Sequence, residues 1–197
     1  MACTALTRSR ALDCNRISGG IKAVYFAVLT DVLAITYDST AAPNQVREID
    51  NIDMGSSSLY KYVLPLGVSS LTDTIVGSRE NGTVYYTPTI NIIYNKLSRA
   101  DQAEIKLLAA TKTVVFAELN QTLANGHNVI TAMGMVNGME LNAGTMDSGA
   151  AWGDRNGYSL TMDGMETEPF AMMVDYTATP FDNADGGAQI PIIAATL

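Results

Sequence analysis

The strongest structural signal in this chain is an alternation of apolar and polar side chains along residues 83–94. Every second residue is apolar, from Val84 to Tyr94, whereas threonine and asparagine dominate the opposite face. A period of two places one face of a strand against a core. Asn81-Gly82 precedes the run and is typical of a hairpin turn, because glycine adopts positive φ without strain. We therefore predict a hairpin of residues 71–78 with 83–94, and Pro88 at an edge or a bulge because proline cannot donate to a ladder.

Further segments rich in β-branched and aromatic residues predict more strands. They are 21–29, 59–64, 111–119, 129–141 and 158–164, with a short strand near 46–52 and with 32–37 either continuing the first strand or pairing with it. Gly134 and Gly138 interrupt 129–141, and Asn125-Gly126 is a predicted turn. We expect long loops over the polar, glycine-containing segments 38–58 and 142–157.

Residues 98–110 have the pattern of a single helix. Ser98 can cap its N-terminus, and Asp101 stands in the first turn, where the helix dipole favours an anion. The expected apolar stripe consists of Ala100, Ala103, Leu107 and Ala110. Such an amphipathic helix is predicted to pack on a sheet.

These elements predict a mainly β (α+β) fold, namely an antiparallel β-sandwich or small barrel with one amphipathic helix packed on its flank. A length of 197 residues fits a single β-rich domain spanning 1–197. We expect residues 1–20 to form a flexible N-terminal segment. Residues 170–197 keep apolar character but are interrupted by proline and glycine, which predicts an edge strand or an arm that orders on a neighbour.

The composition indicates that part of the surface is buried against partners. Charged residues make up only 16% of the chain and hydrophobic residues 47%, whereas a soluble monomer carries about a quarter or more of its surface residues as charged side chains. The formal net charge is -8, and no run of basic residues is present. Tight nucleic-acid binding needs clustered lysine and arginine, so this function is excluded.

The sequence points to synthesis in a cytosol and to no membrane partner. No segment approaches the ~18 continuous apolar residues of a membrane span, and residues 1–10 lack the apolar stretch of a secretory signal. Cys3 and Cys14 could pair across a short loop, but reduced thiols are the expectation for a chain of this size.

No pattern in the sequence predicts catalysis, a cofactor or a metal, so we expect no catalytic, cofactor-binding or metal-binding residues. His127 follows a turn, and with Cys3 and Cys14 it gives three candidate ligands where zinc needs four. The glycine pairs in 134–138 and 153–157 match neither a phosphate loop nor a dinucleotide fingerprint. An enzyme is therefore the weakest functional hypothesis.

Several polar and sulfur-containing groups have plain structural interpretations. Asp163, Glu166 and Glu168 could hold a cation, but a solvated strand end is the favoured interpretation because their spacing fits no EF-hand. Asn81 and Asn120 begin glycosylation patterns that are more simply turn chemistry. The ten methionines suit an adaptable core or subunit interface better than a copper site.

The order of elements, strands followed by one helix at 98–110 and then strands ending on Tyr158-Ser-Leu-Thr-Met-Asp-Gly-Met-Glu-Thr-Glu-Pro169, resembles the tail tube proteins of tailed bacteriophages. The strings Leu12-Asp-Cys-Asn-Arg-Ile-Ser-Gly-Gly-Ile-Lys-Ala-Val-Tyr25 and Gly153-Asp-Arg-Asn-Gly-Tyr158 look similar to small virion structural proteins of Bacteroidetes phages. In the tail tube family, six copies form a ring and rings stack into a tube.

The resemblance implies a structural virion protein whose partners are copies of itself and other tail or neck proteins, located in the virion tail after synthesis in the host cytoplasm. Genomic DNA would be non-specific cargo, and an acidic lumen would let it slide. Ring formation would bury the apolar flanks. The loops 38–58 and 142–157 are the expected contacts between stacked rings. The resemblance implies no catalytic residues.

Two other hypotheses stay open. One is another virion component, such as a head-tail connector, a tail terminator or a capsid-decorating protein. A connector or terminator should stop at one ring, whereas a tube protein stacks repeatedly. The other is a carbohydrate- or host-surface-binding module, in which Trp152, the tyrosines and the polar loops would form the binding face.

Overall fold

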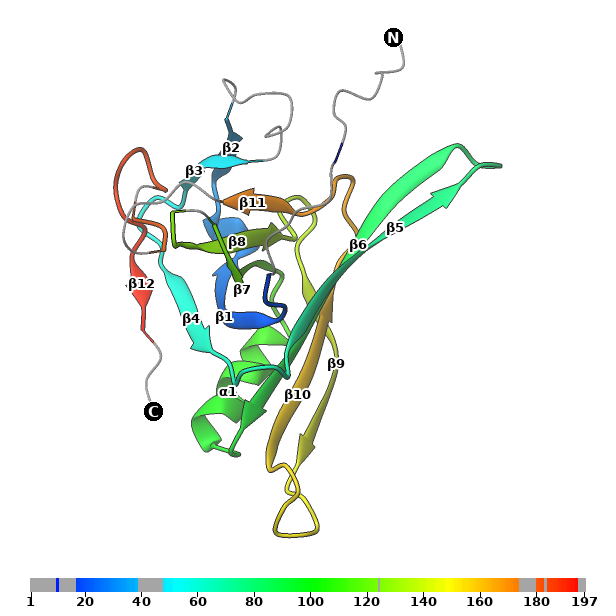
Figure 1. Cartoon of the computed structure of the whole chain (residues 1–197), viewed down its shortest axis with the longest axis vertical. Coiled ribbons are helices and arrows are strands. Elements are labelled where there is room, and N and C mark those ends of the chain that lie inside the picture. Colours follow the sequence, from blue (N-terminus) through cyan, green and yellow to red (C-terminus); the bar gives the residue numbers. More distant parts are fainter. Residues whose placement is uncertain are drawn as a thin grey trace.

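The computed structural model describes residues 10, 17–38, 48–123, 125–173, 180–182 and 184–194 (Figure 1). Cys3 and Cys14 lie outside the described residues, and so does most of segment 1–20. The fold is mainly β with one helix and several antiparallel sheets, in agreement with the predicted sandwich and its single helix.

The larger sheet has six strands in the order β11-β8-β7-β1-β4-β12. Their bounds are β1 Ile21–Val28, β4 Leu59–Val63, β7 Thr113–Thr122, β8 Asn128–Met133, β11 Ala171–Met173 and β12 Ile192–Ile193. All neighbouring pairs are antiparallel except β12 with β4. Segments from both halves of the chain therefore meet in one sheet.

The second sheet has four antiparallel strands in the order β5-β6-β10-β9. Their bounds are β5 Ser70–Ser78, β6 Thr83–Asn95, β9 Glu140–Asp147 and β10 Gly157–Asp163. These are the long diagonal strands of Figure 1. The predicted hairpin of 71–78 with 83–94 is confirmed, and Gly82 in its turn has φ of 62°.

One core lies between the two sheets. Alternate side chains of β1 and β7, such as Val24 and Val115, face Ile90, Ile92 and Leu160 of the four-stranded sheet. As predicted for β10, Tyr158, Leu160 and Met162 point inward and are at most 2% exposed. The period-two pattern of β6 and β10 reflects this one-sided burial.

A second core covers the opposite face of the six-stranded sheet. Tyr25 and Phe116 make edge-to-face contacts with Phe181, and the two-stranded sheet of β2 Ala34–Tyr37 with β3 Ile49–Asp53 adds Ile49 and Ile52. Because this sheet is buried on both faces, β1 and β7 are apolar almost without alternation.

Two predictions about strand positions need correction. Residues 32–37 neither continue β1 nor pair with it, because the 3-10 turn Leu29–Asp31 redirects the chain and β2 pairs with β3. The loop predicted over 142–157 is shorter, because β9 runs to Asp147. Its small and polar residues gave no strand pattern, and a Cβ at Gly144 would lie 2.9 Å from the Cδ2 of Leu160, so a larger residue there would need that side chain to shift.

Pro88 stands in an inner strand and not at an edge or a bulge. Its register with Asp73 of β5 is unbroken, and its carbonyl accepts from the N–H of Gly164. The last pair in the ladder between β6 and β10 is Thr89 with Asp163, so the ladder stops just short of Pro88. The missing N–H of Pro88 therefore falls where the neighbouring strand has already left the ladder.

The predicted helix is α1, Arg99–Leu108, and it is capped as expected: the Oγ of Ser98 accepts from the N–H of Asp101 at 3.0 Å. Its packed face is different from the predicted stripe. Ile105 and Leu108 contact the core between the sheets, whereas Leu107 is 61% exposed. The larger aliphatic side chains at 105 and 108 define the buried face, and the alanine positions do not.

The described part of segment 170–197 contributes to the body of its own chain. β11 and β12 form the two edges of the six-stranded sheet. Phe181 and Ile190 are fully buried in the second core.

Candidate assembly surface

The outer face of the four-stranded sheet is rich in hydroxyl and amide groups. Its strand register brings Ser70, Asn91 and Thr161 into one row, and the Oγ1 of Thr161 donates to the Oδ1 of Asn91 at 2.8 Å. Rows above and below add Thr72, Thr74, Thr87, Thr89, Ser159 and Thr145. The four strands contain no lysine, arginine or histidine.

Charge on this face is acidic. Asp163 and Glu140 stand opposite each other in the β10–β9 register. Asn142 donates from Nδ2 to the Oδ2 of Asp163 at 3.0 Å, and Lys112 forms an ion pair with Glu140 at 2.9 Å. These contacts relieve the repulsion between the two carboxylates. An uncharged polar surface with acidic spots has little affinity for phosphate groups.

The hairpin of β5 and β6 extends beyond the body as a two-stranded arm, which we define as residues 74–87 (Figure 1). From Pro88 toward the turn no β10 residue pairs with β6, and the base of the hairpin is held by the bridge of Tyr86 with Glu166 and by a bond from the N–H of Gly164 to the carbonyl of Pro88. Ile75 and Val84 on the arm are 68% and 61% exposed, so Val84 is not on a buried face as the alternation predicted. Isolated two-stranded hairpins are marginally stable in water.

Residues 148–156 form a compact turn between β9 and β10, which we call the Trp152 loop. The Oδ2 of Asp154 accepts from the N–H groups of Ala150 and Ala151 at 2.9 and 2.7 Å. These bonds, first that of Ala151 and then that of Ala150, lower the pKa of Asp154. Trp152 makes no packing contact that shields it and is fully exposed. A loop ordered by its own hydrogen bonds thus displays a bare indole.

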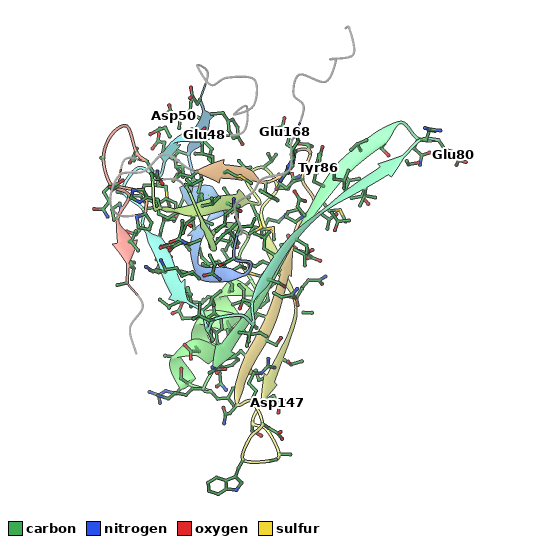
Figure 2. All side chains as sticks on the ribbon, viewed as in Figure 1. Glu48, Asp50, Glu80, Tyr86, Asp147 and Glu168 are labelled. Carbon is green, nitrogen blue, oxygen red and sulfur yellow. The ribbon has the colours of Figure 1, made fainter. Side chains whose placement is uncertain are left out.

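The arm and the Trp152 loop lie at opposite ends of the four-stranded sheet. Figure 2 places Glu80 at the tip of the arm and Asp147, where β9 enters the loop, at the other end. β5 and β9 are the outer strands of this sheet. Among the described residues, each therefore has one unpaired backbone edge, which is a template for pairing with another chain.

A pocket of about 320 Å³ lies between α1, the end of β4 and the end of β6. Its walls include Tyr62, Tyr94 and Leu108, and Asp101 and Glu104 contribute two carboxylates but no lining residue is basic. The hydroxyl of Tyr94 is buried without a hydrogen-bond partner among the described residues. Burial, followed by Tyr62 and Asp101, raises the pKa of Tyr94 well above its ordinary value. The phenol is therefore neutral at physiological pH.

Glu166 is buried, so the predicted solvated strand end is wrong for this residue, whereas Asp163 is partly exposed and Glu168 is exposed. Its carboxylate accepts from the backbone N–H groups of Val136 and Asn137, at 2.9 Å from the latter. The side chain thus holds the turn in which Gly134 and Gly138 have positive φ. Glu166 is therefore a structural anchor for this turn.

The remaining candidate residues are dispersed. His127 is partly exposed beside the turn at Gly126, and its N–H donates to the Oδ1 of Asn125. Asn120 lies in β7 and donates from Nδ2 to the carbonyl of Gly19. In the described ranges, no group of three or more histidine, cysteine or acidic residues could hold a metal ion. Methionines occur both in the core, as Met133 does, and on the surface.

Sequence reasoning missed the arm, the pocket and the anchoring role of Glu166. The arm could have been found from length, because β6 has 13 residues and β10 only seven. The pocket had no local signal, because Tyr94 and Glu104 meet only through the packing of α1 on the sheet.

No helix in the described part of the chain has the length and apolar character needed to cross a membrane. Comparisons with protein-family models, curated proteins and solved structures found no match.

Proposed function

We propose that this protein is a structural virion subunit that assembles with copies of itself into stacked rings, as the tail tube of a tailed bacteriophage. The observation that carries the proposal is the four-stranded sheet. Among the described residues it combines two unpaired edges, four strands that contain no lysine, arginine or histidine, an arm at one end and the Trp152 loop at the other. The edges could join neighbouring copies in a ring, the outer face could line the channel, and the arm and the Trp152 loop could contact the next ring.

Ring closure would use the edges of the sheet. Joining β5 of one copy to β9 of the next would continue the sheet from subunit to subunit and satisfy the backbone groups of both strands. Each copy would use β5 toward one neighbour and β9 toward the other. Because these are two different surfaces, the contact is heterologous and can close into a ring. We propose six copies on the basis of the resemblance to tail tube proteins.

The hydroxyl-rich face would then line the channel. DNA carries one negative charge for every ~1.7 Å of duplex, and lysine or arginine on the wall would bind it. The outer face offers threonine, serine and asparagine with Asp163 and Asp147, and its strands contain no cation. Such a wall lets DNA pass without adhering to it.

A carbohydrate-binding module is the second candidate, and the fully exposed indole of Trp152 is the observation that favours it. Aromatic rings that bind sugars stand beside convergent polar groups in a concave site. The Trp152 loop is a projecting turn whose acceptor, Asp154, is committed to its own backbone. Binding to immobilised glycans, lost in Trp152→Ala, would favour this alternative over the tube.

Negative-stain electron microscopy of the purified chain, together with its mass in solution, tests the proposal. We expect rings and hollow stacks whose length grows with concentration. Single rings that never stack would favour a connector or terminator. A monomer at all concentrations would contradict self-assembly.

A further inference from the structure

The lining of the pocket beside α1 suits a positively charged group at the end of an apolar side chain. Two tyrosines, Tyr62 and Tyr94, line the pocket with their rings in contact at 5.7 Å between centroids, and aromatic rings attract cations. Asp101 and Glu104 supply negative charge, and no lining residue neutralises it. Tyr94 lines the pocket, and its buried hydroxyl has no hydrogen-bond partner among the described residues, so it has accepting capacity to spare. A neutral or anionic occupant would leave these groups uncompensated.

The field of the two carboxylates reaches the phenols. After burial, the largest causes that raise the pKa of Tyr62 are Glu104 and then Asp101. Glu104 is itself exposed, whereas Asp101 is held by the Oγ of Ser98, which donates to its Oδ2 at 2.6 Å. Glu104 is therefore the carboxylate that is free to pair with an incoming cation.

The arm carries a side chain of the matching chemistry. Arg79 in its turn is the only basic residue between Pro65 and Asn95, is exposed, and forms no ion pair with a described residue. A pocket of about 320 Å³ admits one long side chain but not a whole β-turn. Arginine combines an apolar stem with five donors, which suits both the aromatic walls and the tyrosine oxygen.

The surfaces around the two partners also match. Exposed apolar residues lie along the arm, and they are Ile75, Val84 and Tyr85. Others lie on the elements that border the pocket, and they are Val63, Leu66, Val68 and Leu107. Contact between them would remove apolar area from water on both sides, and the charged pair would fix the register.

We propose that the pocket beside α1 receives Arg79 from the arm of a second copy, with Glu104 and the hydroxyl of Tyr94 as its partners. The arm and the pocket are different surfaces of one chain, so the contact is heterologous and repeats from copy to copy. The inference rests on the proposed self-assembly and names the residues that carry one of its contacts. Glu80, beside Arg79 in the turn, stays outside the pocket because the carboxylates repel it.

Charge exchange tests the contact in the full-length chain. Arg79→Glu and Glu104→Lys each place like charges together and should raise the concentration needed for assembly roughly a hundredfold, measured by sedimentation velocity and electron microscopy. The double variant Arg79→Glu with Glu104→Lys should assemble again. An equimolar mixture of the two single variants should also assemble, because alternating copies restore opposite charges at every contact.

Two control variants separate the pocket from general charge effects. Lys106 is on α1 but does not line the pocket, so Lys106→Glu changes the charge of the helix and not that of the pocket. Glu80→Lys makes the tip of the arm more positive, which is the charge that the pocket attracts. Both should assemble as the wild type does. Circular dichroism should show that every variant is folded.

The outcomes distinguish the two proposals. If the wild-type chain stays monomeric, the proposed function fails. If the wild type assembles and Arg79→Glu assembles equally well, or the double variant is not rescued, the contact proposed here is wrong and self-assembly stands. Thermal stabilisation of Arg79→Glu by agmatine, abolished by Glu104→Lys, together with its normal assembly, would assign the pocket to a free amine and overturn the proposal.

Discussion

Glu118 is a buried carboxylate in β7 with two partners. Lys22 contacts its Oε1 at 2.7 Å, and the hydroxyl of Tyr25 donates to its Oε2 at 2.9 Å. Its side chain is 4% exposed, whereas that of Lys22 is 52% exposed. The half-exposed lysine therefore neutralises a carboxylate that is almost inaccessible to water. The charge pair between Lys112 and Glu140 spans 2.9 Å with side chains 57% and 60% exposed.

These two pairs allow a matched comparison of burial. Lys22→Met should lower the free energy of unfolding by about 2 to 4 kcal/mol, because it leaves Glu118 buried with only Tyr25 as a partner. Lys112→Met should lower it by less than about 1 kcal/mol, because the carboxylate of Glu140 that loses its partner is exposed to water. Urea unfolding of dilute, unassembled protein measures both values. Equal effects of the two substitutions would show that burial of Glu118 does not control the result.

Asp154 gives the Trp152 loop a defined response to acid. Its pKa in the folded loop is lowered from the ordinary value of 3.8 by the hydrogen bonds from Ala151 and Ala150. A lowered pKa means that the ionised form stabilises the loop above pH 3.8, and that this stabilisation is lost as the pH falls through the folded value. Fluorescence of Trp152, the only tryptophan, should be constant from neutral pH to about 4 and change below it.

Asp154→Asn supplies the control for this titration, because the amide still offers an oxygen but has no proton to take up. The acid transition of the Trp152 signal should disappear in this variant. A transition centred above pH 3.8 in the wild type would contradict a lowered pKa for Asp154.

At the scale of elements, the sequence predicted features that depend on nearby residues better than features that depend on distant ones. The alternation in β10 and at Ile90 and Ile92 of β6, the turn at Gly82 and the cap of α1 at Ser98 are confirmed, whereas the alternation at Val84 is not. The partner of β2 and the buried face of α1 depend on residues far away in the sequence. For β2 both predicted alternatives, continuing β1 or pairing with it, were wrong. For α1 the predicted stripe was wrong because the helix buries Ile105 and Leu108 and not the alanines.

The candidate surfaces were predictable only in part. The Trp152 loop was expected at 142–157 as a contact region, and the exposed Trp152 is consistent with a loop there. Residues 39–47 of the other expected contact loop, 38–58, lie outside the described residues. Tyr94 and the carboxylates of α1 line one pocket only through tertiary packing, so no local sequence pattern predicts it.

The Trp152 loop can be tested as an element separate from the fold. Trp152→Ala should change the free energy of unfolding by less than about 0.5 kcal/mol, because the indole is fully exposed. In stacked rings the same change should remove a contact of about 2 kcal/mol or more per subunit, as buried tryptophans at interfaces do. Electron microscopy should therefore find rings and short stacks, whereas Trp152→Tyr should retain longer ones. Undiminished stacking in Trp152→Ala would remove the loop from the interface.

At the scale of the whole molecule, the two sheets have different roles. The six-stranded sheet is covered on both faces and holds the two cores. The four-stranded sheet has one buried face, and its outer face, edges and ends carry the surfaces assigned here to the channel and to neighbouring copies. This division explains how a chain with 16% charged residues can present exposed apolar side chains outside its own core.

A cryo-electron microscopy reconstruction of the assembled protein would decide whether the chain forms a tube. We expect a hollow tube whose channel is lined by the four-stranded sheets, with Thr89, Asn91 and Thr161 facing the lumen and β5 of each copy beside β9 of the next. A particle in which this hydroxyl-rich face points outward, or a chain that stays monomeric at every concentration, would contradict it.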